Sequence, residues 1–399
     1  MTPPVPLRHS HTPLLPLLIR IATALLLRTS FHPDEYYQTV EPAYLLTHSV
    51  THSLTNSNLT TDSHTHSHTH SHTHSLTHCI PHSALTWEWQ PDYRLRSHVS
   101  LLPYSLIFYL QNFFITTIAP LPHSLTTKLL LQFLTPRVLQ SVMAVVSDVC
   151  LYQIVSDISG CATASLTLYI HLGSWSLLYC LTRTLANSTE VVMYIVVAWL
   201  WWRSYKSECV SEYVSECVSA SKRESESDSA SVNECVSVCA SGRVVWWEAA
   251  ATALSVVSVY SRPTSLLLLT PLALVMILLK STASLTHSPT HTRTHTRTHT
   301  HTHTHTHTHL LRVTKFLIRS LFVTVITLCV CIVIDDYGYN MLCRMSCVSE
   351  CDSGVVPIPP LNFVRFNFFE NMSARFGVHA WHWHFTQVST HSLTHSLTD

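Results

Sequence analysis

The sequence predicts an all-α, polytopic membrane protein, and three observations support that fold class. Charged residues make up only 12% of the chain, whereas hydrophobic residues make up 47%. Soluble domains carry about 25% charged residues, roughly twice this fraction. The hydrophobic residues are gathered in runs, several of them long enough for a helix to cross about 30 Å of hydrocarbon, and polar tracts separate these runs. We therefore expect a bundle of membrane helices joined by loops.

Eight apolar runs are candidate helices. The first is interrupted by Arg20 and has no small-residue cleavage site behind it, so we expect it to be retained as a membrane span. The runs at 189–203 and 244–260 are short. We expect one of these two not to cross the membrane, because the loops behind the first and the last run are expected on the same side. The runs lie at 13–28, 99–119, 129–156, 161–181, 189–203, 244–260, 263–280 and 312–334.

Low-complexity tracts interrupt the apolar runs. A Thr-His-Ser repeat fills 47–82 and returns at 281–310 and at the end of the chain, and a Val-Ser-Glu-Cys repeat fills 207–241. Neither composition can bury a core. The cysteines of the second repeat follow its period and lack the paired spacing of a zinc site. Alternating histidines bind zinc or nickel weakly, so we expect incidental metal affinity and no resident metal.

The runs and tracts together predict the domain organisation. We expect the N-terminus and first span at 1–28, a catalytic loop at 29–98, spans at 99–206, a low-complexity insert at 207–241, spans at 242–280, a His/Thr repeat at 281–310, a span at 311–334, and a second loop with a repeat tail at 335–399.

The charge balance excludes one class of partner. The chain has 23 basic and 23 acidic residues, so no excess field attracts nucleic acid, and we exclude nucleic-acid binding. Asp148 and Asp157 lie within or beside apolar runs. An ionisable group at such a position either serves function or pairs with a neighbouring helix, and the sequence leaves both readings open.

A first motif, FHPDEYYQTVEPAY, follows the first apolar run. Its proline suits the first position of a helix, which places Asp34 and Glu35 in the first turn near the positive end of the helix dipole. On an α-helix Asp34 would share a face with Gln38 and Glu41. The pattern is typical of a plain helix start and equally of a pair of reactive carboxylates at the membrane surface.

A second motif, LTWEWQPDYRLRS, precedes the second apolar run. Trp87 and Trp89 offer flat faces for a sugar or for the membrane interface, and Glu88 can accept hydrogen bonds from hydroxyl groups. Arg94 and Arg96 can each grip a phosphate through two N–H donors. Alone, the motif is equally typical of an interfacial aromatic belt with flanking arginines.

Together these motifs resemble the dolichol-phosphate-mannose-dependent mannosyltransferases of the endoplasmic reticulum. Further collinear blocks share the resemblance, and within the family they are most similar to the enzymes that add the third mannose of the glycosylphosphatidylinositol (GPI) anchor. These blocks lie at 136–152, 175–190, 261–272, 333–336 and 363–385. The resemblance ends near Gln387, so we expect the C-terminal part of the family fold to be missing.

The resemblance implies a GT-C-like transmembrane bundle with luminal catalytic loops in the endoplasmic reticulum membrane. It implies transfer of mannose, in α-1,2 linkage and with inversion, from dolichyl phosphate mannose to a GPI-anchor intermediate among membrane lipids, with no cofactor. Asp34 would be the general base and Glu35 the second candidate, and Arg94 or Arg96 would bind the donor phosphate. Gln38, Glu41 and the second motif would contact substrate, as would a second luminal loop containing His379, Trp381, His382 and Trp383.

Other readings stay open at this stage. A related enzyme of the same family could act on a lipid-linked oligosaccharide, and a truncated member could be inactive. A histidine-rich metal transporter is a further alternative, but it requires ligands inside the spans, where His171 stands isolated. The adjacent Asp335 and Asp336 keep a metal site conceivable, although a departing phosphate monoester does not require a metal.

The loop behind the first span and the loop at 363–385 should face the same compartment. Asn58 and Asn371 stand in Asn-x-Ser/Thr sequons, so reporter sequons engineered beside both should be glycosylated if both loops are luminal. The measurement is the glycosidase-sensitive shift of each variant on a gel. Modification beside only one of them would show that the predicted topology is wrong.

Overall fold

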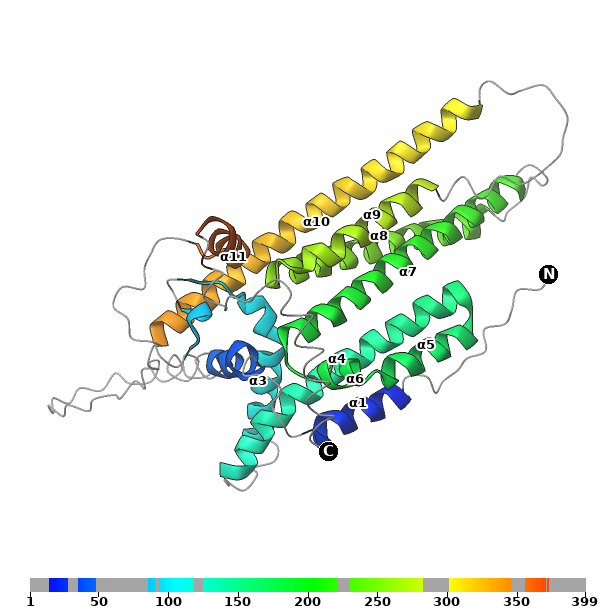
Figure 1. Ribbon diagram of the computed structural model, residues 1–399. Coiled ribbons are helices and arrows are strands. Elements are labelled where there is room, and N and C mark those ends of the chain that lie inside the picture. Colours follow the sequence, from blue (N-terminus) through cyan, green and yellow to red (C-terminus); the bar gives the residue numbers. More distant parts are fainter. Residues whose placement is uncertain are drawn as a thin grey trace, which may run out of the picture.

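The computed structural model describes residues 14–27, 35–47, 85–90, 93–117, 125–221, 230–282, 301–345, 356–370 and 372, and all regular structure within these ranges is helical (Figure 1). The all-α prediction is therefore confirmed for the described part of the chain. The long helices run side by side as an elongated bundle, and the short elements that carry the sequence motifs gather at one end of it.

The long helices coincide with the predicted apolar runs. The run at 161–181 is the one that divides: α5 ends at Gly173 and α6 begins at Trp175. The α-helices are α1 (Leu14–Leu26), α3 (Leu102–Thr117), α4 (Leu125–Ser159), α5 (Cys161–Gly173), α6 (Trp175–Cys180), α7 (Ala186–Ser221), α8 (Ala230–Ser261), α9 (Ser265–Thr282), α10 (His301–Met345) and α11 (Pro359–Val364). Short 3-10 or π turns are η1 (Tyr36–Val40), η3 (Trp87–Trp89), η4 (His98–Leu101) and η5 (Arg365–Phe369).

Helices α7 and α8 form the centre of the bundle. Helix α10 packs on α8, α9 packs against α7, and α4 joins α7 to α5 and α1. The core between α7, α8 and α9 contains Val197, Trp201, Ala251, Leu269 and Met276, all at most 8% exposed. Burial of each large apolar side chain contributes about 1.5–3 kcal/mol to stability, so this contact holds the three helices together.

Within the described ranges, three helical segments are long and apolar enough to cross a membrane: Leu130–Ser159, Gly242–Ser261 and Val313–Cys343. The last has a mean hydropathy of 2.6, yet only 6% of its most apolar window is buried inside the protein. A helix that is apolar and exposed is stable only in an apolar solvent, so the outer face of α10 fits contact with lipid. Two shorter apolar helices, Leu14–Leu26 and Ser265–Ser281, lie beside them.

Buried charges in the bundle are paired. Arg20 of α1 donates two hydrogen bonds of 3.0 Å to Asp148 of α4, and both side chains are fully buried. The His171 Nε2 lies 3.0 Å from the same carboxylate. Pairing is the condition under which a charge is tolerated in an apolar interior, so Asp148 joins α1 and α5 to α4. Asp157, at the end of α4, pairs with Lys206 at 2.6 Å.

Several helices extend beyond the predicted boundaries, and α8 and α10 begin at Ala230 and His301, inside predicted low-complexity tracts. Helix α7 continues to Ser221 inside the Val-Ser-Glu-Cys repeat, because that part of the repeat contains no glycine or proline to end a helix. Glu208, in the repeat, accepts a hydrogen bond of 2.6 Å from Lys280, which also pairs with the buried Glu248. Helix α10 likewise runs past residue 334 to Met345.

This extension of α10 brings Asp335 and Gly338 against η4. Asp335 is fully buried and accepts hydrogen bonds from the Ser97 hydroxyl (3.1 Å) and the His98 amide (2.6 Å). The His98 ring lies flat against Gly338, where an added Cβ would stand 2.6 Å from Cδ2 and 2.8 Å from Nδ1. Real Cβ atoms do not approach so closely, so only glycine fits at this contact.

Substitution Gly338→Ala should lower stability by about 1–3 kcal/mol through overpacking, despite the better helix propensity of alanine. The measurement is the unfolding temperature of the purified protein in detergent. Gly173→Ala is the matched control, because nothing lies within 4 Å of a Cβ at that position. Adding His98→Ala should restore part of the loss. An unchanged unfolding temperature in Gly338→Ala would show that α10 and η4 do not meet as described.

Candidate active site

The motif behind the first span contains a π turn. The helix that begins at Glu35 continues to Thr47, but from Tyr36 to Val40 it is a π-helix, and the Glu41 amide donates to the Tyr36 carbonyl. A π turn holds more residues than an α turn, so the sequence-based expectation that i and i+4 positions share a face does not carry over to this segment. Such turns occur frequently at functional sites.

Glu35 holds this turn to the bundle. Its carboxylate is 1% exposed and receives hydrogen bonds from Arg137 of α4 (3.1 Å) and from Arg183 (3.3 Å). The Thr184 hydroxyl donates to the Glu35 carbonyl at 3.3 Å, and Arg137 also donates to the Leu27 carbonyl at 2.8 Å. One carboxylate therefore ties the end of α1, helix α4 and the start of α7 together.

The second motif forms a tight turn that pairs its own charges. Glu88 in η3 is buried, and Arg96 donates to both of its oxygens, at 2.9 and 3.1 Å. The Leu95 amide donates to the Glu88 carbonyl at 2.9 Å. The turn passes through Arg94 with a φ of 46°, a left-handed conformation that is uncommon outside glycine. Glu88, which was predicted to accept hydrogen bonds from sugar hydroxyls, is thus paired with Arg96, which was predicted to bind the phosphate.

The aromatic residues of this motif take different positions. Trp89 is 1% exposed and packs in a core with Tyr104 and Phe108, so it lies inside the protein and not at a sugar-binding surface. Trp87 is half-buried and stacks against Tyr93 and Phe366, at ring distances of 5.5 and 5.4 Å.

Two residues of later segments hold the motif from outside. The Tyr339 hydroxyl of α10 donates to the Arg96 carbonyl at 2.6 Å, and the Asn362 amide of α11 donates to the Arg94 carbonyl at 3.3 Å. The Arg94 guanidinium itself stands 5.8 Å from the Tyr339 ring centre. The loop behind the first span and the segment 356–370 therefore meet at the same end of the bundle.

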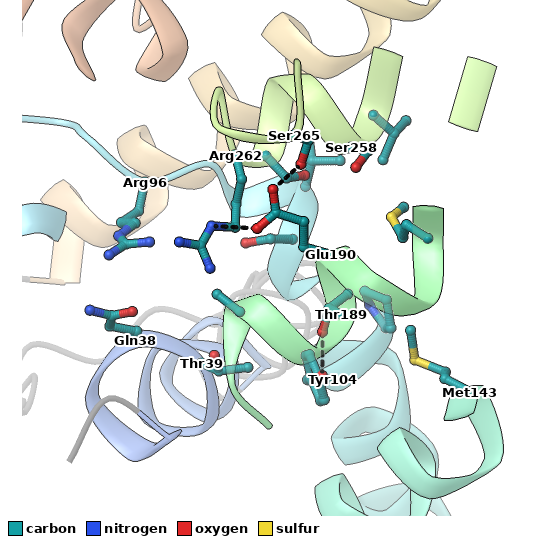
Figure 2. Close-up of a pocket in the computed structure, with 17 residues that line it drawn as sticks. Gln38, Thr39, Arg96, Tyr104, Met143, Thr189, Glu190, Ser258, Arg262 and Ser265 are labelled. Carbon is teal, nitrogen blue, oxygen red and sulfur yellow. Dashed lines mark hydrogen bonds and ion pairs between the residues drawn. The ribbon is translucent and has the colours of Figure 1, made fainter. Parts of the chain in front are cut away.

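A cavity of about 110 Å³ opens where these elements meet (Figure 2). Its wall combines apolar side chains with polar groups at the ends of several helices. It is lined by Gln38, Thr39, Arg96, Val99, Ser100, Pro103, Tyr104, Met143, Ala186, Thr189, Glu190, Met193, Val257, Ser258, Ser261, Arg262 and Ser265. Of the residues singled out from the sequence as functional, Gln38 and Arg96 face this cavity together.

The opposite wall carries a second arginine. Arg262 follows the end of α8, where it donates a hydrogen bond to Asn187 and lies 3.6 Å from Glu190. Glu190 also accepts from the hydroxyls of Thr264 (3.2 Å) and Ser265 (2.7 Å). Figure 2 shows the Arg96 and Arg262 side chains next to each other, with the Arg262 guanidinium directed toward that of Arg96. Both arginines also line an adjoining cavity of about 280 Å³, with Pro263, Phe363 and Asn367.

The floor of the first cavity is a buried polar network. The Tyr104 hydroxyl donates to Gln140 at 2.6 Å, and the Thr189 hydroxyl donates to the same amide oxygen at 3.3 Å. Tyr104 and Gln140 are at most 1% exposed. These two hydrogen bonds fix the Tyr104 and Thr189 hydroxyls on the Gln140 amide oxygen, whereas the buried Gln140 amide nitrogen has no hydrogen-bond partner among the described residues.

Several predicted residues cannot be placed. Asp34 and the group His379, Trp381, His382 and Trp383 lie outside the described residues.

Glu41 is half-buried, and this burial raises the pKa of its carboxyl. Arg183, Glu190 and Arg262 were not singled out from the sequence as functional, although all three stand in blocks that carry the family resemblance.

Within the described ranges no group of three or more His, Cys, Asp or Glu side chains is placed to hold a metal ion. Asp335, which the sequence left open as a ligand, accepts hydrogen bonds from Ser97 and His98.

The fold and the site define a class: a helical membrane protein whose polar, arginine-lined cavity lies at one end of its helices. The chain belongs to the Alg9-like mannosyltransferase family, whose sequence profile matches residues 71–397. The resemblance inferred from the motifs is thereby confirmed.

The chain is similar to proteins named for GPI mannosyl transfer. It is 28% identical over 183 residues to human GPI alpha-1,2-mannosyltransferase 3, covering 45% of this chain and 24% of the human protein. It is 23% identical over 185 residues to mannosyltransferase APTG1 of Arabidopsis thaliana, covering 46% of this chain and 26% of that protein. The aligned part thus spans about a quarter of the length of these relatives. No solved structure matches the chain significantly.

The Glu35 anchor generates a prediction on stability. Substitution Glu35→Gln should destabilise the protein by about 3–5 kcal/mol, because it leaves Arg137 and Arg183 buried without their shared counter-charge. The measurement is the unfolding temperature and the amount of protein in the membrane fraction. The matched control is Glu370→Gln, which removes a carboxylate paired with an exposed arginine and should cost less than about 1 kcal/mol. Equal stability of the two variants would contradict the anchoring role.

Proposed function

We propose that this protein is an inverting α-mannosyltransferase that adds the third, α-1,2-linked mannose to a GPI-anchor intermediate. The donor is dolichyl phosphate mannose, and the reaction takes place on the luminal side of the endoplasmic reticulum membrane, in a GT-C-like fold. The observation that carries the proposal is the family match together with an arginine-lined cavity beside the Glu35 turn. The names of the similar proteins support the GPI intermediate as acceptor.

Asp34 is the general base of the proposed mechanism. It precedes Glu35, and a trans peptide keeps their Cα atoms about 3.8 Å apart. Because Glu35 is locked between Arg137 and Arg183, it is the less suitable base: its carboxylate is buried and already serves two cations. Asp34 therefore takes the proton, and Glu35 positions the turn that carries it. Gln38, which lines the cavity, contacts the sugar in this proposal.

The reaction is a single displacement at the anomeric carbon. The acceptor hydroxyl oxygen bonds to that carbon as the bond to the phosphate oxygen breaks, and the hydroxyl proton moves to the Asp34 carboxylate. The bonding electrons leave with the lipid phosphate, whose charge changes from about −1 to −2. A cation that is already in place stabilises this growing charge without reorganisation. Arg96, half-buried at the cavity edge, supplies that cation.

The remaining predicted residues have supporting roles in this proposal. Arg94 and Glu88 hold the Arg96 turn in shape, and Trp87 closes it against Phe366. The residues His379, Trp381, His382 and Trp383 form part of the acceptor wall, and Glu41 extends the sugar side.

Substitution Asp34→Asn should lower mannose transfer by roughly 10²–10⁴-fold, the usual contribution of a positioned base, because the amide cannot accept the proton. The assay uses cells that lack the third mannosyltransferase, with the chain extended by the C-terminal region of a relative. Accumulation of the two-mannose precursor is the readout.

Asp157→Asn is the control, because this carboxylate pairs with Lys206 on another part of the bundle. Protein abundance should be normal in both variants. Full restoration of anchors by Asp34→Asn would overturn the assignment of the base. Transfer to a lipid-linked oligosaccharide in place of the GPI precursor would overturn the acceptor.

A further inference from the structure

Two arginines from distant parts of the chain meet at the junction of two cavities. Arg96 comes from the loop before α3 and Arg262 from the connection between α8 and α9, and both line the cavity of about 110 Å³ and the cavity of about 280 Å³. Their side chains lie next to each other in Figure 2, with the Arg262 guanidinium directed toward that of Arg96. Two like charges facing each other repel, so this arrangement requires neutralisation from elsewhere.

Each of the two arginines is paired with a carboxylate. Glu88 pairs with Arg96, and its side chain is 4% exposed against 21% for the arginine. Glu190 pairs with Arg262, and its side chain is 12% exposed against 23%. On both sides the carboxylate is the more buried partner. The arginines are therefore the more exposed members of their ion pairs, and both line the two cavities.

We propose that Arg262 and Arg96 together form a clamp for the phosphate ester of the lipid-linked sugar donor, with Arg262 as the second phosphate ligand. The identification of the ester as the donor's rests on the proposed function. Planar guanidinium groups bind phosphate oxygens through two parallel N–H donors, so two facing forks can hold one tetrahedral anion between them.

The position of the clamp between two cavities fits a phosphodiester. Such an ester has two substituents, and the arginine pair lines two cavities. The sugar would extend past Gln38, toward the turn that carries the proposed base. The lipid would extend toward Pro263 and Phe363, which line the other cavity.

The second arginine has a specific task in transfer. When the sugar leaves, the diester becomes a monoester and its charge grows from about −1 to −2, so the clamp binds the leaving group more tightly than the donor. Glu190 positions Arg262 for this task, because the hydroxyls of Thr264 and Ser265 and the Arg262 side chain all converge on its carboxylate. The apolar wall, which includes Val99, Pro103 and Val257, strengthens the attraction by excluding water.

The test is direct binding of farnesyl phosphate to the purified full chain in detergent, compared with farnesol, which lacks the phosphate. Arg262→Gln should weaken binding of farnesyl phosphate by about 10-fold or more, as expected for the loss of a charge-assisted contact, and should leave farnesol unchanged. Arg262→Lys keeps the charge but loses the fork, so its affinity should fall between those of the parent and Arg262→Gln.

Arg203→Gln is the matched control. This arginine lies on α7 about 20 Å along the helix from Glu190 and stacks on Trp199 and Trp247. Its removal should leave farnesyl phosphate binding unchanged. The unfolding temperature of each variant shows whether it is folded, and Arg262→Lys carries the test should Arg262→Gln fail to fold.

Further ligands identify the source of the phosphate. If competition by phosphoethanolamine, which resembles the acceptor's phosphate, depends on Arg262 while binding of farnesyl phosphate does not, the assignment to the donor is overturned. Equal loss of farnesol and farnesyl phosphate binding in Arg262→Gln would overturn the clamp itself. The binding assay does not require mannose transfer. If the chain has no transfer activity but still binds farnesyl phosphate through Arg262, the proposed function fails while this inference stands.

Discussion

The buried carboxylate of Glu35 is the contact on which the rest of the site depends. It receives Arg137 from α4 and Arg183 from the start of α7, and through Arg137 it is tied to the carbonyl that follows α1. A carboxylate in such surroundings is costly without partners and strongly held with them. The motif behind the first span is therefore not a loop that happens to lie near the bundle. It is joined to the bundle by charge, and the cavity that Gln38 and Thr39 line is built on that junction.

Within the site, the sequence predicted which segments matter better than it predicted what each side chain does. The family resemblance assigned both motifs to substrate contact, and in the structure Ala43 of the first motif and Trp89 of the second pack in one core. The partners of Glu35 could not be predicted, since Arg137 and Arg183 come from segments far along the chain. The π turn could not be predicted from the sequence either, because it differs from an α-helix only in its hydrogen-bond register.

The fold was predictable where the apolar runs are long and less so where composition is ambiguous. Helices α4, α8 and α10 follow from hydropathy alone. The boundaries at 207 and 334 were placed where composition changes, yet the helices continue. The repeat from 207 to Ser221 contains no glycine or proline and remains compatible with a helix, whereas the segment after 334 is held by contacts of Asp335 and Tyr339 with the turn at 96–98. Glu208 then finds Lys280, a pairing that depends on how α7 and α9 pack and not on local sequence.

The contact between Gly338 and His98 sets the height of α10 in the bundle. A helix advances 1.5 Å and turns 100° with each residue, so a slip of even one position would carry the only hydrogen-sized side chain away from the imidazole and bring a bulky one against it. Further along α10, Arg319 pairs with Glu248 of α8, so the contact at Gly338 fixes the other end of a helix whose most apolar window is little buried. The contact therefore fixes the position of α10 along its own axis relative to the turn that carries His98.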